Sequence, residues 1–191
     1  MREGRLGDAG AYKAAALTAA PYAETLNRVL QLSDPLPDFA VLSSAAVPSG
    51  SLGQAYLAFV AKHRISPLTI SPEVRSEVAS VNLVAARYVL VHDLFHVLLG
   101  FGIDRPGELA VWSFVSEQRY SPTYARAAAL ARALYPLAAP SARVELQRQR
   151  AKAVQLAREV PCLIAQPFEL YWTQPLQAVR SNLGVLAPFE A

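Results

Sequence analysis

Two of the three histidines in this chain lie one helical turn apart, in a stretch that is otherwise mostly apolar. His92 and His96 are four residues apart, and the run from Val91 to Gly100 is dominated by Val, Leu and Phe. Residues i and i+4 lie on the same face of an α-helix, so both imidazoles are expected to point in one direction. Two imidazoles in this arrangement can hold one divalent metal ion. The spacing therefore indicates a metal or catalytic site.

Two carboxylates accompany the histidines. Asp93 lies about 100° around the helix from His92, where it can be a third ligand or can accept a hydrogen bond from an imidazole N–H. Glu108 follows the break at residues 100–102 and falls in the first turn of the next expected helix. If that helix returns antiparallel to the first, the carboxylate completes an N₂O₂ site. The candidate metal ligands and catalytic residues are therefore His92, Asp93, His96 and Glu108.

A structural polar cluster is the alternative interpretation of these four residues. Buried histidines are often hydrogen-bonded core residues. However, burying four ionisable groups between apolar helices is unfavourable unless a metal ion or mutual hydrogen bonds compensate.

The composition predicts one domain, residues 1–191, with a large apolar interior. Hydrophobic residues make up 53% of the 191 residues and charged residues 17%, which is more apolar than an average soluble domain. No run of eighteen uninterrupted apolar residues occurs, so no transmembrane helix is predicted. The excess of apolar side chains therefore requires a large core, a lipid-sized cavity or a membrane-facing surface.

Charge and cysteine content exclude several classes of protein. The net charge of +3 is too small to indicate a nucleic-acid partner, and aromatic residues are not interleaved with Lys or Arg. Cys162 is the single cysteine, which excludes an internal disulfide and a cysteine-based zinc site. The mixed charges of residues 1–5 and the interruption at Lys13 are atypical of a secretory or transit peptide. A cytoplasmic bacterial protein, or a trimmed mature form, is expected.

The hydrophobic pattern predicts an all-α fold, a bundle of seven or eight helices. Ser71 and Asp104 are expected to cap helices that carry proline in their first turn, and Gly184 is expected to end the last helix. The predicted helices cover residues 9–32 with a break at Pro21, 38–47 with an aspartate cap at Asp38, 52–63, 72–79, about 80–99, a segment from Asp104 onward, 121 to about 137 closed by Pro136 and Pro140, 141–160, and a short C-terminal piece.

The segment from Ser141 to Val160 is basic as well as amphipathic. It contains five cations and two acids, together with a partial apolar stripe. Such a helix can lie on an anionic membrane, and the alternative is an ordinary solvated surface helix. In the preceding segment, small residues between Ala125 and Ala133 allow close helix packing or leave space for a ligand.

The four candidate ligands together resemble the His-Asp-x-x-His, eleven residues, Glu signature of the coenzyme Q (ubiquinone) biosynthesis protein 4 family. The resemblance extends over residues 51–185, whereas residues 1–50 match less. No organelle-targeting extension is evident, so a bacterial member is expected. The other matching segments are Leu52-Gly53-Gln54-Ala55-Tyr56, Arg87-Tyr88, Pro106-Gly107-Glu108, and a C-terminal set of Phe168-Glu169, Trp172, Leu176, Arg180 and Leu183-Gly184.

The resemblance implies an all-helical protein of ubiquinone biosynthesis that holds a divalent ion beside an apolar cavity for a polyprenyl lipid. Zinc is the expected ion, with magnesium, iron or manganese as alternatives. The expected partners are a polyprenyl lipid or quinone precursor, other quinone-biosynthesis enzymes and the surface of the inner membrane, to which the protein would bind peripherally. The sequence also leaves a homodimer open.

Three roles for the ion remain open at this point. The first is a metal-dependent enzyme that oxidatively removes the C1 carboxylate of a prenylated hydroxybenzoate. The second is a non-catalytic, lipid-binding scaffold that organises the biosynthetic enzymes at the membrane. The third, a purely structural ion joining two helices, is the least favoured.

Overall fold

The computed structural model describes residues 2–44 and 46–189, and the part it describes contains helices and no strand. The all-α prediction is confirmed. Eight of the ten α-helices have seven or more residues, in agreement with the predicted number. The ten α-helices of the described residues are α1 (Arg2–Leu17), α2 (Ala23–Leu30), α3 (Phe39–Ser44), α4 (Leu52–His63), α5 (Pro72–Leu99), α6 (Arg105–Glu117), α7 (Pro122–Ala138), α8 (Arg143–Glu159), α9 (Phe168–Tyr171) and α10 (Leu176–Asn182).

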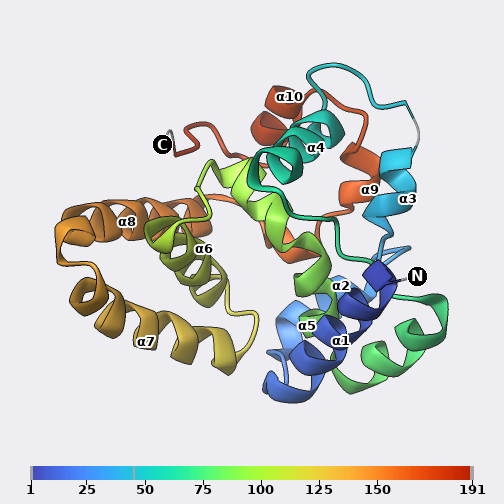
Figure 1. Cartoon of the computed structure of the whole chain (residues 1–191), viewed down its shortest axis with the longest axis horizontal. Coiled ribbons are helices and arrows are strands. Elements are labelled where there is room, and N and C mark those ends of the chain that lie inside the picture. Colours follow the sequence, from blue (N-terminus) through green and yellow to red (C-terminus); the bar gives the residue numbers. More distant parts are fainter. Residues whose placement is uncertain (1, 45, 190–191) are drawn as a thin grey trace.

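Helix α5 is the centre of the fold. Figure 1 shows its second half passing through the middle of the molecule, its first half at the edge beside α1, α4 and α10 near its C-terminal end, and α6, α7 and α8 forming a separate lobe. By length and composition α5 could cross a membrane, with a mean hydropathy of 1.3 over eighteen residues, but 67% of that window is buried inside the protein. It is therefore the core helix of this fold.

Local sequence signals set most of the helix ends. Ser51 accepts a hydrogen bond from the Gln54 amide at the start of α4, and Asp104 accepts one from the Gly107 amide at the start of α6. Gly100 ends α5 in the left-handed conformation, with φ of 82°. The expected change of helix near Ser80 or Asn82 is a kink at Asn82, whose φ of −161° and ψ of 89° are not helical.

The bounds of two predicted helices differ from the structure: α3 ends at Ser44 rather than at residue 47, and α1 starts earlier than expected. The first helix begins at Arg2 rather than at residue 9, although the break around Pro21 is present. Of the two prolines expected to close α7, Pro140 lies just beyond its end at Ala138, whereas Pro136 lies inside it. This position near the end of α7 leaves few helical hydrogen bonds to lose.

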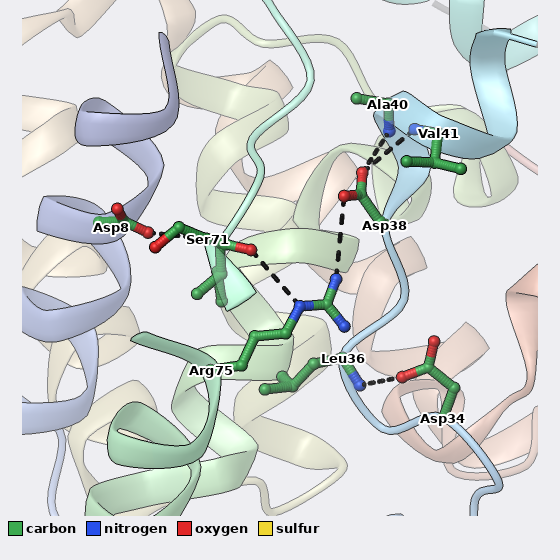
Figure 2. A network of polar contacts seen from close by, with 9 residues as sticks. Asp8, Asp34, Leu36, Asp38, Ala40, Val41, Ser71 and Arg75 are labelled. Atoms are coloured by element: carbon green, nitrogen blue, oxygen red, sulfur yellow. Dashed lines mark hydrogen bonds and ion pairs between the residues drawn. The ribbon is translucent and has the colours of Figure 1, made fainter. Parts of the chain in front are cut away.

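An aspartate-rich loop holds α3 and the start of α5 together, as Figure 2 shows. Asp38 accepts hydrogen bonds from the amides of Ala40 and Val41 and so caps the start of α3. Its second oxygen lies 3.9 Å from the guanidinium of Arg75 in α5. From α1, Asp8 accepts a hydrogen bond from the Ser71 amide at 2.7 Å. These contacts fix the direction in which α5 enters the core.

Candidate metal centre

The candidate ligands lie on the second half of α5 and the first turn of α6. A short connection, residues 100–104, joins the two helices. A β-carbon built on Gly107 would lie 1.8 Å from the carbonyl oxygen of Gly102, so the first turn of α6 packs directly on this connection. The tight turn brings Glu108 back over the histidines, as the sequence predicted.

The structure brings together His92, His96 and Glu108. One donor atom from each lies within 4.8 Å of the other two. Nε2 of His92 lies 3.6 Å from Oε2 of Glu108, and Nε2 of His96 lies 3.5 Å from Oε1. Donor atoms that surround a tetrahedral ion at about 2.0–2.1 Å are roughly 3.3 Å apart. The Glu108 carboxylate is therefore positioned to bind the same ion as the two imidazoles.

His96 has the clearest signature of a ligand. Its side chain is completely buried, and Nδ1 lies 3.2 Å from the Phe101 carbonyl oxygen, which can only accept a hydrogen bond. That bond places the proton on Nδ1 and leaves a lone pair on Nε2. Nε2 is buried without a hydrogen-bond partner among the described residues. A buried acceptor without a partner is unfavourable, and a bound cation would satisfy it.

Asp93 lies beside His92, outside the group formed by the other three residues. Its Oδ1 is 3.3 Å from Nδ1 of His92, and Nε2 of the same ring faces Glu108. A carboxylate in this position accepts the N–H of an imidazole ligand, fixes its orientation and raises its basicity. The geometry thus favours a hydrogen bond to His92, rather than direct binding of the ion, as the role of Asp93.

The two histidines differ in electrostatic environment. Burial lowers the pKa of His96, and the neighbouring His92 lowers it further, so this ring is neutral. Burial also acts to lower the pKa of His92, but hydrogen bonds and charge from Asp93 and Glu108 outweigh it and raise the pKa to about 9. The pair of carboxylates therefore favours a positive charge at this position, which a proton or a metal cation can supply.

Arg180, in α10, forms hydrogen bonds with the C-terminal end of α5. Its guanidinium donates to the carbonyls of Leu98 at 3.0 Å and Val97 at 2.8 Å. These carbonyls belong to the last turn of α5, where no further helical N–H is available. Arg180 therefore fixes the turn that follows His96, a role that local spacing in the sequence does not indicate.

Beside His96, a mainly apolar groove of about 330 Å³ lies between α4, the end of α5 and α10. The Phe59 ring stacks on the His96 ring with centroids 5.8 Å apart, and His63 packs on Phe59 at 4.6 Å. Lys62 is one of the lining residues and provides a positive charge there. The lipid-sized cavity expected from the composition stays a prediction, and this groove is its nearest counterpart.

Comparisons with known proteins match this chain to one protein family. The profile of the family described as Coenzyme Q (ubiquinone) biosynthesis protein Coq4 matches residues 31–188. The chain is 35% identical over 143 residues to the mitochondrial ubiquinone biosynthesis protein COQ4 homolog of Homo sapiens, and 34% identical over 143 residues to that of Bos taurus. Both alignments cover 75% of this chain and 53% of the relative, so the chain spans about half the length of these relatives.

A solved structure supports the same fold. A crystal structure of a candidate ubiquinone biosynthesis protein from Nostoc punctiforme superimposes with a TM-score of 0.66 at 18% identity. The superposition covers 98% of this chain and 83% of that one. The helical arrangement described above is thus also found in an experimental structure.

Proposed function

Because the chain belongs to the Coq4 family of coenzyme Q (ubiquinone) biosynthesis proteins, we propose that it binds a divalent metal ion in order to hold the polar head of a prenylated quinone precursor. His92, His96 and Glu108 are the proposed ligands, and Asp93 orients His92. The proposed substrate is a polyprenylated hydroxybenzoate, and the proposed reaction is removal of its C1 carboxylate.

The unpartnered Nε2 of His96 is the observation that carries this proposal. Two imidazole nitrogens and one carboxylate form the donor set of many catalytic zinc sites, in which a fourth position is left for water or substrate. The same set is used by non-haem iron enzymes that handle dioxygen. The two nitrogen donors favour zinc or iron, and to a lesser degree manganese, over magnesium.

A bound ion would act as a Lewis acid toward the carboxylate or phenolate of the precursor. Glu108 faces both imidazoles and would help to fix the position of the ion to which the head group binds. Phe59, next to His96, would provide an apolar surface for the aromatic ring of the precursor. Lys62, which lines the groove, would attract the anionic head group. Oxidative decarboxylation replaces CO₂ with a hydroxyl group and requires an external oxidant such as dioxygen.

A non-catalytic scaffold is the second candidate function. It would bind the same prenylated precursor through the same ion and present it to other quinone-biosynthesis enzymes at the membrane. The groove beside His96 favours this alternative, because it is an open surface feature from which a bound lipid could be passed on. Both candidates place the protein peripherally at the membrane that contains the lipid.

The metal site is tested by elemental analysis of the purified protein. We expect about one equivalent of zinc or iron in the wild type and nearly complete loss in His96→Ala, because His96 is the buried ligand. His63→Ala is the matched control, since His63 packs on Phe59 outside the ligand group and should leave the metal content unchanged. Equal metal content in His96→Ala and the wild type would refute the site.

The catalytic proposal is tested by supplying the carboxylated prenyl-phenol to cells that lack the protein. Glu108→Gln keeps the size of the side chain but removes its charge. If the protein is the enzyme, cells with Glu108→Gln will accumulate the carboxylated precursor, and cells with the wild type will form the C1-modified product. If the variant restores the product as well as the wild type does, the catalytic proposal fails.

A further inference from the structure

Helix α7 presents a row of leucines to solvent. Leu130 is 60% exposed, Leu134 49% and Leu137 76%, and they are spaced at i, i+4 and i+7. This spacing places all three on one face of the helix. Just beyond the turn to α8, Val144 is 77% exposed. Single exposed leucines are common on protein surfaces, but a continuous row of this kind indicates an interaction surface.

The exposed leucines lie on the side of α7 that does not pack on the core. The opposite face of α7 packs on α6, where Ala131 contacts the cluster around Leu109 and Trp112 lies with its ring centroid 6.4 Å from that of Tyr135. Figure 1 shows α7 along the outer edge of the lobe formed by α6, α7 and α8. The leucine row therefore faces away from the rest of the protein.

The segment that carries the exposed leucines contains basic but no acidic side chains, although Arg132 lies on another side of α7, where it lines a pocket together with Glu117. Between Glu117 and Glu145 the sequence contains no Asp or Glu but four arginines. Three of these, Arg126, Arg132 and Arg143, are exposed, and none of the three forms an ion pair within residues 2–44 and 46–189. Arg126 lies one turn before Leu130, on the same face. The combination of exposed leucines with unpaired arginines is typical of helices that lie in the interface of an anionic membrane.

We propose that this face, Arg126, Leu130, Leu134, Leu137 and Val144, binds to an anionic phospholipid surface. The leucines would enter the acyl-chain boundary while the arginines reach the phosphates. Charge complementarity favours this occupant over a second copy of the chain, since the face contributes a cation, Arg126, and no carboxylate that could pair with the same cation of another copy. The proposal rests on the function proposed above and deepens it by naming the surface that meets the membrane.

The position of α7 also connects this face to the metal centre. Tyr124, in the first turn of α7, packs edge-on against Tyr88 with centroids 4.7 Å apart. Tyr88 in turn packs edge-on against His92 at 5.4 Å. The rings of Tyr124 and Tyr88 therefore connect the N-terminal end of α7 to His92. A membrane in contact with α7 would meet the helix that carries this connection to the proposed ligands.

Vesicle co-sedimentation tests the proposal. The full chain is mixed with vesicles of phosphatidylcholine alone or of phosphatidylcholine containing one-third phosphatidylglycerol. We expect binding to the anionic vesicles that weakens with added salt, and a loss of affinity of about tenfold or more in the double variant Leu130→Asp/Leu134→Asp. Leu170→Asp is the matched control, because Leu170 is 63% exposed on α9 and outside this face.

Equal binding of the double variant and the wild type would overturn the proposal. So would a concentration-dependent dimer in sedimentation velocity that the double variant abolishes, since the face would then be occupied by a second copy. Circular dichroism establishes that the variant is folded. Metal content, measured on the same samples, is expected to stay at the wild-type level, so failure of membrane binding and failure of the metal site give different results.

Discussion

The candidate ligands act in different ways although they lie within seventeen residues of sequence. His96 is completely buried, and the carbonyl of Phe101 fixes its tautomer. His92 and Glu108 are partly exposed and face the same point from two helices. Asp93 contacts only His92 within the group. Removing a ligand should therefore abolish the site, and removing Asp93 should only weaken it.

Asp93→Asn tests this difference. The asparagine keeps the size of the side chain but removes the charge that supports His92, so we expect metal affinity to fall by about 10- to 100-fold without loss of the site. Competition with a chromophoric chelator measures the dissociation constant. Glu24→Gln, which changes an exposed carboxylate in a helical pair with Arg28, should leave the constant unchanged. Complete loss of metal from Asp93→Asn would instead identify Asp93 as a ligand.

At the scale of the elements, the centre depends on how closely α6 approaches the end of α5. Gly107 is the residue that permits this approach, since any side chain would collide with the Gly102 backbone. Gly107→Ala should therefore displace the first turn of α6, move Glu108 away from the histidines and reduce metal content to well below half of the wild-type value. Elemental analysis and circular dichroism measure the two effects.

Gly10→Ala is the matched control for that substitution. Gly10 lies inside α1, and a β-carbon there meets nothing within 4 Å. The change should stabilise the protein by about 0.5–1 kcal/mol because glycine is a poor helix former, and it should leave the metal content unchanged. Normal metal content in Gly107→Ala would show that the turn tolerates a side chain.

Arg87 joins α5 to two loops from distant parts of the sequence. It is completely buried and donates to the carbonyls of Pro35 and Gln166 at 2.7 Å and to that of Ile164. Burial lowers its pKa to about 10, which still leaves it charged at neutral pH. Arg87→Met should lower the free energy of unfolding in urea by about 3 kcal/mol or more, because several buried carbonyls would lose their donors. Arg126→Met, at an exposed site, should change it by less than about 0.5 kcal/mol.

The sequence predicts the elements better than the contacts between them. Helix ends at Ser51, Asp104 and Gly100 follow from residues within four positions of each end, so local patterns locate them. The proximity of His92, His96 and Glu108 follows from the helical spacing and one short turn. The bonds of Arg180 to α5 join residues 82 and 83 positions apart, and no local pattern contains that information.

For the whole molecule, an ion bound by α5 and α6 would link the central helix to the lobe of α6, α7 and α8. Binding to the folded state alone should stabilise the protein by about 2.7 kcal/mol at free metal of 100 times Kd, which raises Tm by roughly 5–10 °C for a chain of this length. Differential scanning fluorimetry with and without a chelator measures the change. His96→Ala should show no metal-dependent shift, and an equal shift in this variant would place the ion elsewhere.

The short connection between α5 and α6 has a consequence for biosynthesis. All the candidate ligands have been synthesised once the ribosome reaches Glu108, whereas Arg180, which holds the last turn of α5, comes 72 residues later. Closing so short a loop around an ion costs little chain entropy. The order of the sequence would therefore let a nascent chain bind the proposed ion before its C-terminal segment exists, and metal supply during translation would then affect the yield of folded protein.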